Sequence, residues 1–162
     1  MRLHLGCGDV LIKDYINCDL YNDKADIKCD VRQLPFESNS VDEILTFHLI
    51  EHFDFFEAFE VLKEWRRVLK PYGRLYIETP NLLTSCEEFV KANEQERIDF
   101  YRHFFSTPWI PGQFHKFLYT ETQLTWTLEK SNFVNIKVLP ALRYIGKEKV
   151  NLGMEAFKND ID

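Results

Sequence analysis

The sequence opens with a strand pattern that leads directly into two closely spaced glycines. The segment is Leu3-His4-Leu5-Gly6-Cys7-Gly8-Asp9. Glycine has no Cβ, so a strand that ends in Gly-x-Gly lets the backbone come very close to a ligand. The turn that follows directs backbone N–H groups at that ligand. This segment therefore predicts a first strand over residues 2–6 that ends at a small-molecule site.

Two further short apolar runs each end in a carboxylate. Residues 15–19 end in Asp19, and residues 27–30 end in Asp30. If these runs are parallel strands beside the first one, both carboxylates lie at strand carboxyl ends next to the glycine loop. Open α/β sheets bind their ligands at that edge. A carboxylate placed there suits a vicinal diol or an exocyclic amine.

The rest of the chain predicts alternating strands and helices. The expected strands are 43–48, 73–79, 133–139 and 151–158, and the expected helical segments are 54–69, 82–105 and 120–131. Only eight residues separate the first two strands, and seven or eight separate the second from the third. A full strand–helix–strand crossover needs about 10–12 residues. We therefore expect reduced helices in the N-terminal half and one face of the sheet left partly uncovered.

Several longer motifs carry a family resemblance. They are Leu34-Pro35-Phe36, Phe47-His48-Leu49-Ile50-Glu51-His52 and Arg67-Val68-Leu69-Lys70-Pro71-Tyr72-Gly73-Arg74-Leu75. With the glycine loop, they make nearly the whole chain similar to the class I S-adenosylmethionine (SAM) methyltransferases, in particular a short branch of the type 11 group. The resemblance implies a Rossmann-like three-layer sandwich with a mostly parallel seven-stranded sheet and an antiparallel last strand. It also implies one SAM-binding domain over residues 1–162, with residues 82–119 covering the acceptor site.

The same resemblance assigns the SAM-binding residues. It implies that the loop Gly6-Cys7-Gly8 holds the methionine end of SAM. The acid Asp19 would bind the ribose hydroxyls, and its neighbour Leu20 is also expected to contact the cofactor. Asp30 would approach the adenine amine, and the backbone of Val31 would touch the ring. His48 follows the fourth strand, beside the expected position of the SAM methyl group.

His48 is also the candidate catalytic residue. A sulfonium leaves as a neutral thioether, so methyl transfer needs no acid, only a positioned nucleophile and a base if that nucleophile carries a proton. Imidazole titrates near neutral pH, which suits such a base. The alternative is that His48 only packs or contacts SAM. We interpret Glu51 as a residue that favours the N-terminus of helix 54–69.

The acceptor is expected to meet an aromatic-rich segment. Trp109 and His115 are the candidate substrate-binding residues, and residues 105–116 have the prolines and glycine of a loop that could close over a substrate. We assign no metal ligand. Cys7, Cys18 and Cys29 would come near one another at three strand ends, and we interpret them as buried free thiols rather than a soft-metal site.

These observations predict an enzyme that methylates an oxygen or nitrogen nucleophile on a small or medium-sized molecule. The main alternative is a non-catalytic binder of SAM or S-adenosylhomocysteine. It is favoured by His4, where the family usually has an acid, and by Val10, where a third glycine is common. A nicotinamide site fits poorly because Leu11 replaces the third fingerprint glycine and Asp19 comes too early.

Charge and hydropathy restrict the partners. The net charge is −6, which argues against a nucleic-acid substrate or an anionic membrane surface. The sequence contains no apolar run of about 18 residues and no signal-peptide pattern, so we expect a cytoplasmic protein without a membrane anchor. The uncovered sheet face predicts apolar surface and a homodimer.

Overall fold

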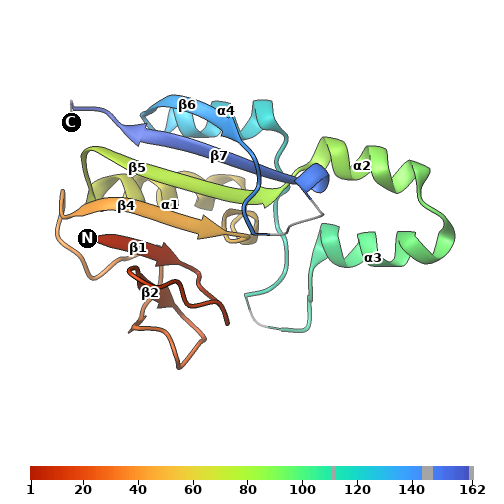
Figure 1. Ribbon diagram of the computed structural model, residues 1–162, viewed down its shortest axis with the longest axis horizontal. Coiled ribbons are helices and arrows are strands. Elements are labelled where there is room, and N and C mark those ends of the chain that lie inside the picture. Colours follow the sequence, from red (N-terminus) through yellow and green to blue (C-terminus); the bar gives the residue numbers. More distant parts are fainter. Residues whose placement is uncertain (111, 144–147, 161–162) are drawn as a thin grey trace.

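One seven-stranded sheet forms the centre of the molecule (Figure 1). The computed structural model describes residues 1–110, 112–143 and 148–160. In spatial order, the strands are β3 (Ile27–Lys28), β2 (Ile16–Asp19), β1 (Arg2–Leu5), β4 (Val41–Phe47), β5 (Leu69–Pro80), β7 (Asn151–Lys158) and β6 (Phe133–Leu139).

The strand directions agree with the predicted mixed sheet. Strands β1 to β5 are parallel, and β7 runs antiparallel to both β5 and β6. Strand β1 lies between β2 and β4. The sheet extends from β1 through β2 and β3 in one direction and through β4 and β5 in the other, so the strand order reverses at β1. This reversal is a topological switch point, where open α/β sheets form a ligand crevice at the strand carboxyl ends. The glycine loop begins directly there.

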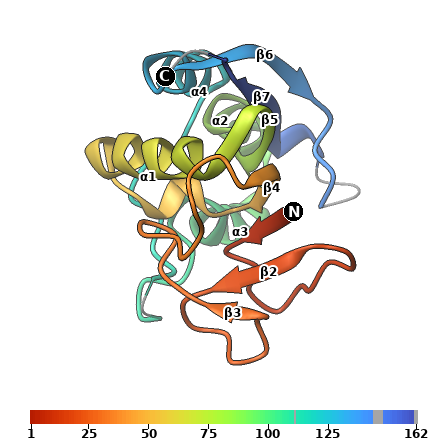
Figure 2. The same ribbon diagram turned by 90° about the vertical axis from the view of Figure 1, so that its left-hand side faces the viewer.

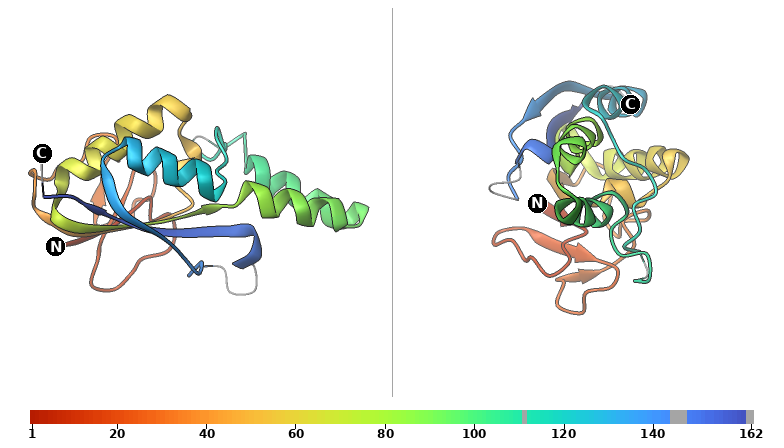
Figure 3. Two further views of the ribbon diagram at one scale, coloured as in Figure 1. Left: turned by 90° about the horizontal axis from the view of Figure 1, so that it is seen from above. Right: turned by 90° about the vertical axis from the view of Figure 1, so that its right-hand side faces the viewer.

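Two helices cover one face of the sheet, and two others project beyond its edge. The helices are α1 (Phe55–Val68), α2 (Leu82–Lys91), α3 (Glu94–Phe105) and α4 (Glu121–Lys130), with 3-10 turns η1 (Ile50–His52) and η2 (Glu148–Val150). Figure 2 shows α1 and α4 on the same side of the sheet. Helices α2 and α3 form a hairpin past the carboxyl ends of the strands (Figure 3). None of the described helices is long and apolar enough to cross a bilayer.

Helix α1 has clear local signals for its position. The Asp54 side chain accepts hydrogen bonds from the backbone N–H groups of Phe56 and Glu57, and the Glu57 side chain accepts one from the Asp54 N–H. This reciprocal capping box satisfies N–H groups that the first turn would leave unpaired. The inner face of α1 buries Val61, Leu62 and Trp65 in the main core.

The opposite face of the sheet carries no helix among the described residues. A small cluster of Leu45, Phe47 and Tyr76 lies there, with side chains from the links and from β6 packed against it. The predicted lack of helices between the first three strands is confirmed, since these links contain only turns. The third layer of the expected sandwich therefore consists of loops in the described part of the chain.

Candidate functional site

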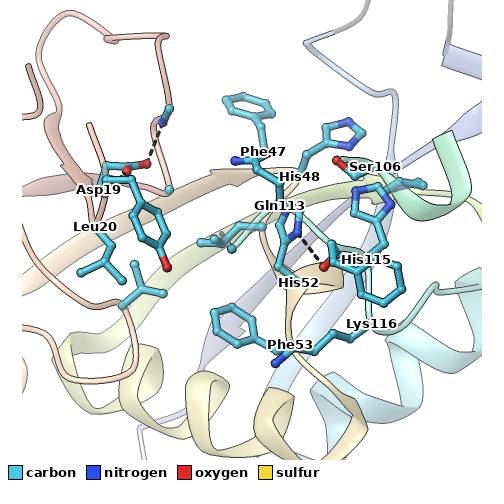
Figure 4. Close-up of a pocket in the computed structure, with 18 of the residues that line it drawn as sticks. Asp19, Leu20, Phe47, His48, His52, Phe53, Ser106, Gln113, His115 and Lys116 are labelled. Atoms are coloured by element: carbon cyan, nitrogen blue, oxygen red, sulfur yellow. Dashed lines mark hydrogen bonds between the residues drawn. The ribbon is translucent and has the colours of Figure 1, made fainter. Parts of the chain in front are cut away.

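A cavity of about 900 Å³ opens at the carboxyl edge of the sheet, between the glycine loop and the segment that follows α3 (Figure 4). One end is lined by Gly6, Gly8, Asp19 and Asp30. The other end is lined by imidazoles and further polar side chains, listed here: His48, His52, Arg102, His103, Ser106, Gln113, His115 and Asn151. One cavity therefore joins the two groups of residues that the sequence singled out.

Both glycines of the loop adopt positive φ angles, 63° at Gly6 and 49° at Gly8. A Cβ on Gly6 would lie 2.7 Å from Leu49 Cδ1, whereas a Cβ on Gly8 would meet no heavy atom within 4 Å. A side chain at position 6 would thus collide with Leu49, whereas the space beside Gly8 is unoccupied by protein atoms. Cys7 lies behind the loop: its side chain is fully buried outside the cavity lining, and its N–H donates to the Cys18 carbonyl at 3.1 Å.

The Asp19 carboxylate organises the backbone around the loop. Its Oδ2 accepts a hydrogen bond from the Gly8 N–H at 2.9 Å. Its Oδ1 accepts from the N–H groups of Tyr21 at 2.7 Å and Asn22 at 2.9 Å. The next residue, Leu20, is partly exposed and lines the cavity. This carboxylate is nearly buried and fixes the glycine loop relative to the end of β2.

Asp30 and Val31 also line the cavity. The Arg32 guanidinium hydrogen-bonds both Asp30 oxygens, at 2.6 to 3.0 Å, and this contact lowers the pKa of Asp30. The Val31 carbonyl accepts a hydrogen bond from Trp65 Nε1 at 3.1 Å. The Asp30 carboxylate is thus ionised, and the Val31 carbonyl accepts its hydrogen bond from a core side chain, Trp65.

His48 stands where β4 ends and the chain turns sharply. Its φ is 51°, an uncommon value for a residue with a side chain. Its backbone N–H donates to the Glu78 carbonyl at 2.7 Å, which ties the turn to β5. Its Nδ1 lies 3.1 Å from Glu51 Oε1, and its side chain is 18% exposed. Backbone and carboxylate together hold the imidazole at the cavity.

Glu51 does not act as the expected helix-terminal residue. Asp54 caps α1, while Glu51 lies in η1 with a fully buried side chain. Burial alone would raise the pKa of Glu51, but His48 and the other nearby imidazoles outweigh that effect and lower it. Its Oε2 accepts from the Thr79 hydroxyl at 3.0 Å. The predicted role of Glu51 at the helix N-terminus was wrong because Glu51 lies within the 3-10 turn that precedes α1.

The structure brings His115 to the cavity but leaves Trp109 outside it. His115 Nε2 lies 3.9 Å from Glu51 Oε1, and burial lowers the pKa of the His115 imidazole. Trp109 is 79% exposed and is absent from the cavity lining. Pro111, which the predicted loop includes, lies outside the described residues. The sequence therefore identified one of the two cavity contacts.

Sequence reasoning missed Gly112, which lines the cavity, and Glu78, which does not line it but lies 3.8 Å from His48 Nε2. A Cβ on Gly112 would lie 2.6 Å from Tyr21 Cε2, so the segment after α3 packs against the end of β2. Glu78 is fully buried at the end of β5, and its Oε2 accepts from the N–H groups of Leu142 and Arg143. A charged residue inside the apolar run of β5 is the signal that could have identified Glu78.

His4 occupies the position at which the resembling family has an acid. It is fully buried, its Nδ1 lies 3.2 Å from Asn17 Oδ1, and its ring packs edge-on against Phe47. Burial lowers the pKa of His4. This side chain is part of the support beneath the loop and does not line the cavity.

Residues 17–77 match the model of a family described as a methyltransferase domain. That match spans β2 through most of β5, including Asp19, Asp30 and His48. No curated protein is significantly similar to the chain in sequence.

Solved structures share the fold at low sequence identity. A SAM-dependent methyltransferase from Methanosarcina mazei has a TM-score of 0.66 and 20% identity, over 98% of this chain and 92% of that one. A SAM-dependent enzyme from Thermotoga maritima, described as a possible histamine N-methyltransferase, has a TM-score of 0.64 and 17% identity, over 98% and 82%. A possible exported protein from Bordetella parapertussis has a TM-score of 0.59 and 16% identity. The similarity covers 82% of this chain and 43% of that longer protein.

Proposed function

We propose that this chain is a SAM-dependent methyltransferase and that it methylates an oxygen or nitrogen nucleophile on a small or medium-sized molecule; the methyltransferase-domain match and the shared fold support this. One observation carries this proposal: a single cavity joins a glycine loop with two carboxylates to a group of imidazoles. Its volume, about 900 Å³, is near the upper end of the range typical of small-molecule sites. Such a cavity suits a cofactor and an acceptor bound end to end.

The residues at the loop end fit SAM. The open side of Gly8 offers space for the methionine end along the loop. Asp19 uses three of its roughly four acceptor positions on backbone N–H groups, which leaves one for a ribose hydroxyl. We assign the adenine end to Asp30, Val31 and Leu20, which line the same side of the cavity. SAM supplies an electrophilic methyl group attached to sulfur.

We assign His48 as the base that takes the proton of the acceptor. Its contact with Glu51 fixes the orientation of the imidazole, in the way that a carboxylate orients a catalytic histidine. His48 lines the cavity between the glycine loop and the other imidazoles, so an acceptor bound there would lie within its reach. The remaining work is positioning, because the leaving thioether needs no proton.

Residues 82–119 are proposed to cover the acceptor. Arg102, Ser106 and His115 from this segment line the cavity, and Gly112 of the same segment packs against Tyr21, which also lines it. His115 would contact the acceptor directly. Trp109 would join it only if the loop moves inward from its exposed position.

We also keep the single domain, the homodimer and the cytoplasmic location as predictions from the sequence.

A donor-turnover assay tests the proposal. The purified protein is incubated with SAM and pools of phenols, alcohols, amines and carboxylates, and release of S-adenosylhomocysteine is measured. We expect at least one pool to raise release above the acceptor-free rate, and His48→Asn to abolish that increase. Tight SAM binding by calorimetry without turnover in any pool would instead support the non-catalytic binder.

A further inference from the structure

Three side chains at the acceptor end of the cavity form a set of metal-ligand types. Glu51, His52 and His115 each offer one ligand atom, and these atoms all lie within 4.8 Å of one another. Among the residues that the structure describes, no other group of three His, Cys, Asp or Glu side chains meets this condition. Glu51 and His52 come from η1, whereas His115 comes from the segment after α3.

Backbone carbonyls orient both imidazoles. His52 Nδ1 lies 3.1 Å from the Phe114 carbonyl oxygen, and His115 Nδ1 lies 3.2 Å from the Phe104 carbonyl oxygen. A carbonyl oxygen only accepts hydrogen bonds, so each Nδ1 carries a proton, and Nε2 is the atom that a neutral imidazole in this orientation offers as a ligand. This pattern is the usual support of metal-bound histidines, which donate their other N–H to a carbonyl or carboxylate.

The Glu51 carboxylate faces this pair without full compensation. It is completely buried, and its Oε1 has no partner of acceptable hydrogen-bond geometry among the described residues, although His48 Nδ1 is 3.1 Å away. The same Oε1 lies 3.9 Å from His115 Nε2. Two lone-pair-bearing atoms that face each other in a buried site repel unless a cation lies between them.

We propose that Glu51, His52 and His115 bind a divalent transition-metal ion such as Zn²⁺ or Mn²⁺. Two imidazoles and one carboxylate form a recurring ligand set for such ions, and three protein ligands leave coordination positions open. Metal–ligand bonds of about 2.0–2.2 Å place ligand atoms roughly 3–4 Å apart, so the most widely separated ligand atoms need to approach each other by about 1–2 Å. Two of the three ligands, His52 and His115, line the cavity that the acceptor would enter.

The ion also specifies the acceptor, and this second step rests on the proposed function. A hydroxyl oxygen bound to a divalent ion loses its proton at a lower pH than a free hydroxyl. That proton passes to His48, an oxygen lone pair forms the new bond to the methyl carbon, and the electron pair of the carbon–sulfur bond returns to sulfur as S-adenosylhomocysteine is released. The acceptor class is therefore an oxygen nucleophile, an alcohol or phenol that can ligate a metal.

Metal titration of the protein without SAM or acceptor tests the site itself. Chelator-treated protein is titrated with ZnCl₂ by calorimetry and with MnCl₂ by electron paramagnetic resonance. We expect about one ion per chain, with His52→Gln and His115→Gln weakening binding at least about 100-fold. His103→Gln is the matched control, because His103 lines the same cavity but bonds Ser85 at 2.8 Å outside the cluster. We expect it to stay within about 3-fold of the unaltered protein.

Folding and activity controls separate the possible failures. Glu51→Gln is included, and a thermal melt checks its folding; if it fails to fold, the two histidine variants decide the result. The site is refuted if the folded protein binds neither ion at roughly 100 μM, or if both histidine variants bind as the control does. The acceptor assignment is refuted if chelation leaves hydroxyl methylation unchanged. Metal binding without any methyl transfer would refute the proposed function and leave the site standing.

Discussion

Replacement of Asp19 by asparagine tests how the glycine loop is held for SAM. The carboxylate now accepts from Gly8 on Oδ2 and from Tyr21 and Asn22 on Oδ1. An asparagine side chain has one accepting oxygen and one donating nitrogen. Its oxygen would keep the two contacts from Tyr21 and Asn22, so its nitrogen would face the Gly8 N–H and two donors would meet at about 2.9 Å.

The expected magnitude follows from the bonds lost. A hydrogen bond to a charged group contributes about 1.5–3 kcal/mol. Loss of one such bond to a ribose hydroxyl, with a displaced Gly8, should weaken SAM binding on the order of 10- to 100-fold. The free energy of unfolding should also fall by about 1–3 kcal/mol, because the buried Gly8 contact is lost.

Calorimetric titration with SAM measures the affinity, and urea unfolding measures the stability. Asp23→Asn is the matched control, since the Asp23 side chain is 87% exposed and pairs with Lys28. We expect this control to bind SAM within about 2-fold of the unaltered protein. A folded Asp19→Asn protein that binds SAM within about 3-fold would refute the assigned role of Asp19.

Four further predictions follow from the structure. His48→Asn should lower turnover at least about 100-fold and leave SAM affinity within a few-fold, because asparagine tolerates the positive φ of 51° but takes up no proton; a near-normal rate would remove His48 as the base. Arg67 lowers the pKa of Glu64, so the stability that this carboxylate contributes is complete above about pH 4.5 and lost as pH falls. Glu64→Gln should therefore cost about 1–3 kcal/mol in urea unfolding at pH 7 and much less near pH 3, whereas a difference independent of pH would contradict this. Trp109 fluorescence should change when a product analogue binds, and a constant spectrum would argue against loop closure. Light scattering at roughly 20 μM should give the mass of a dimer, and a monomer mass would contradict the predicted association.

Much of the fold could be predicted because the sequence signals for strands, turns and helix ends are local. Strands 133–139 and 151–158 were placed with their observed bounds. The helical region 82–105 was predicted as one unit but divides at Ala92. Asn93 and Glu96 form a capping box there. The sequence therefore contained a signal for the start of a second helix, which the prediction did not use.

The two ends of the cavity differ in how far sequence could predict them. Asp19 and Asp30 were identifiable because Asp19 ends β2 and Asp30 lies just beyond β3, and parallel strands bring their carboxyl ends to one edge. The contact between Glu51 and His115 has no local pattern, since the two residues are distant in sequence and meet only through the path of the chain after α3. Trp109 was selected for its surroundings in sequence, and its exposed position depends on a loop conformation that residue types do not determine.

The structure of the protein crystallised with S-adenosylhomocysteine tests the central claim most directly. The account predicts the ligand in the cavity at the carboxyl ends of β1 to β3, with its ribose against Asp19, its adenine beside Asp30 and Val31, and its sulfur directed toward His48. A ligand bound outside this cavity, or one that lies in it with its sulfur directed away from His48, would contradict the account.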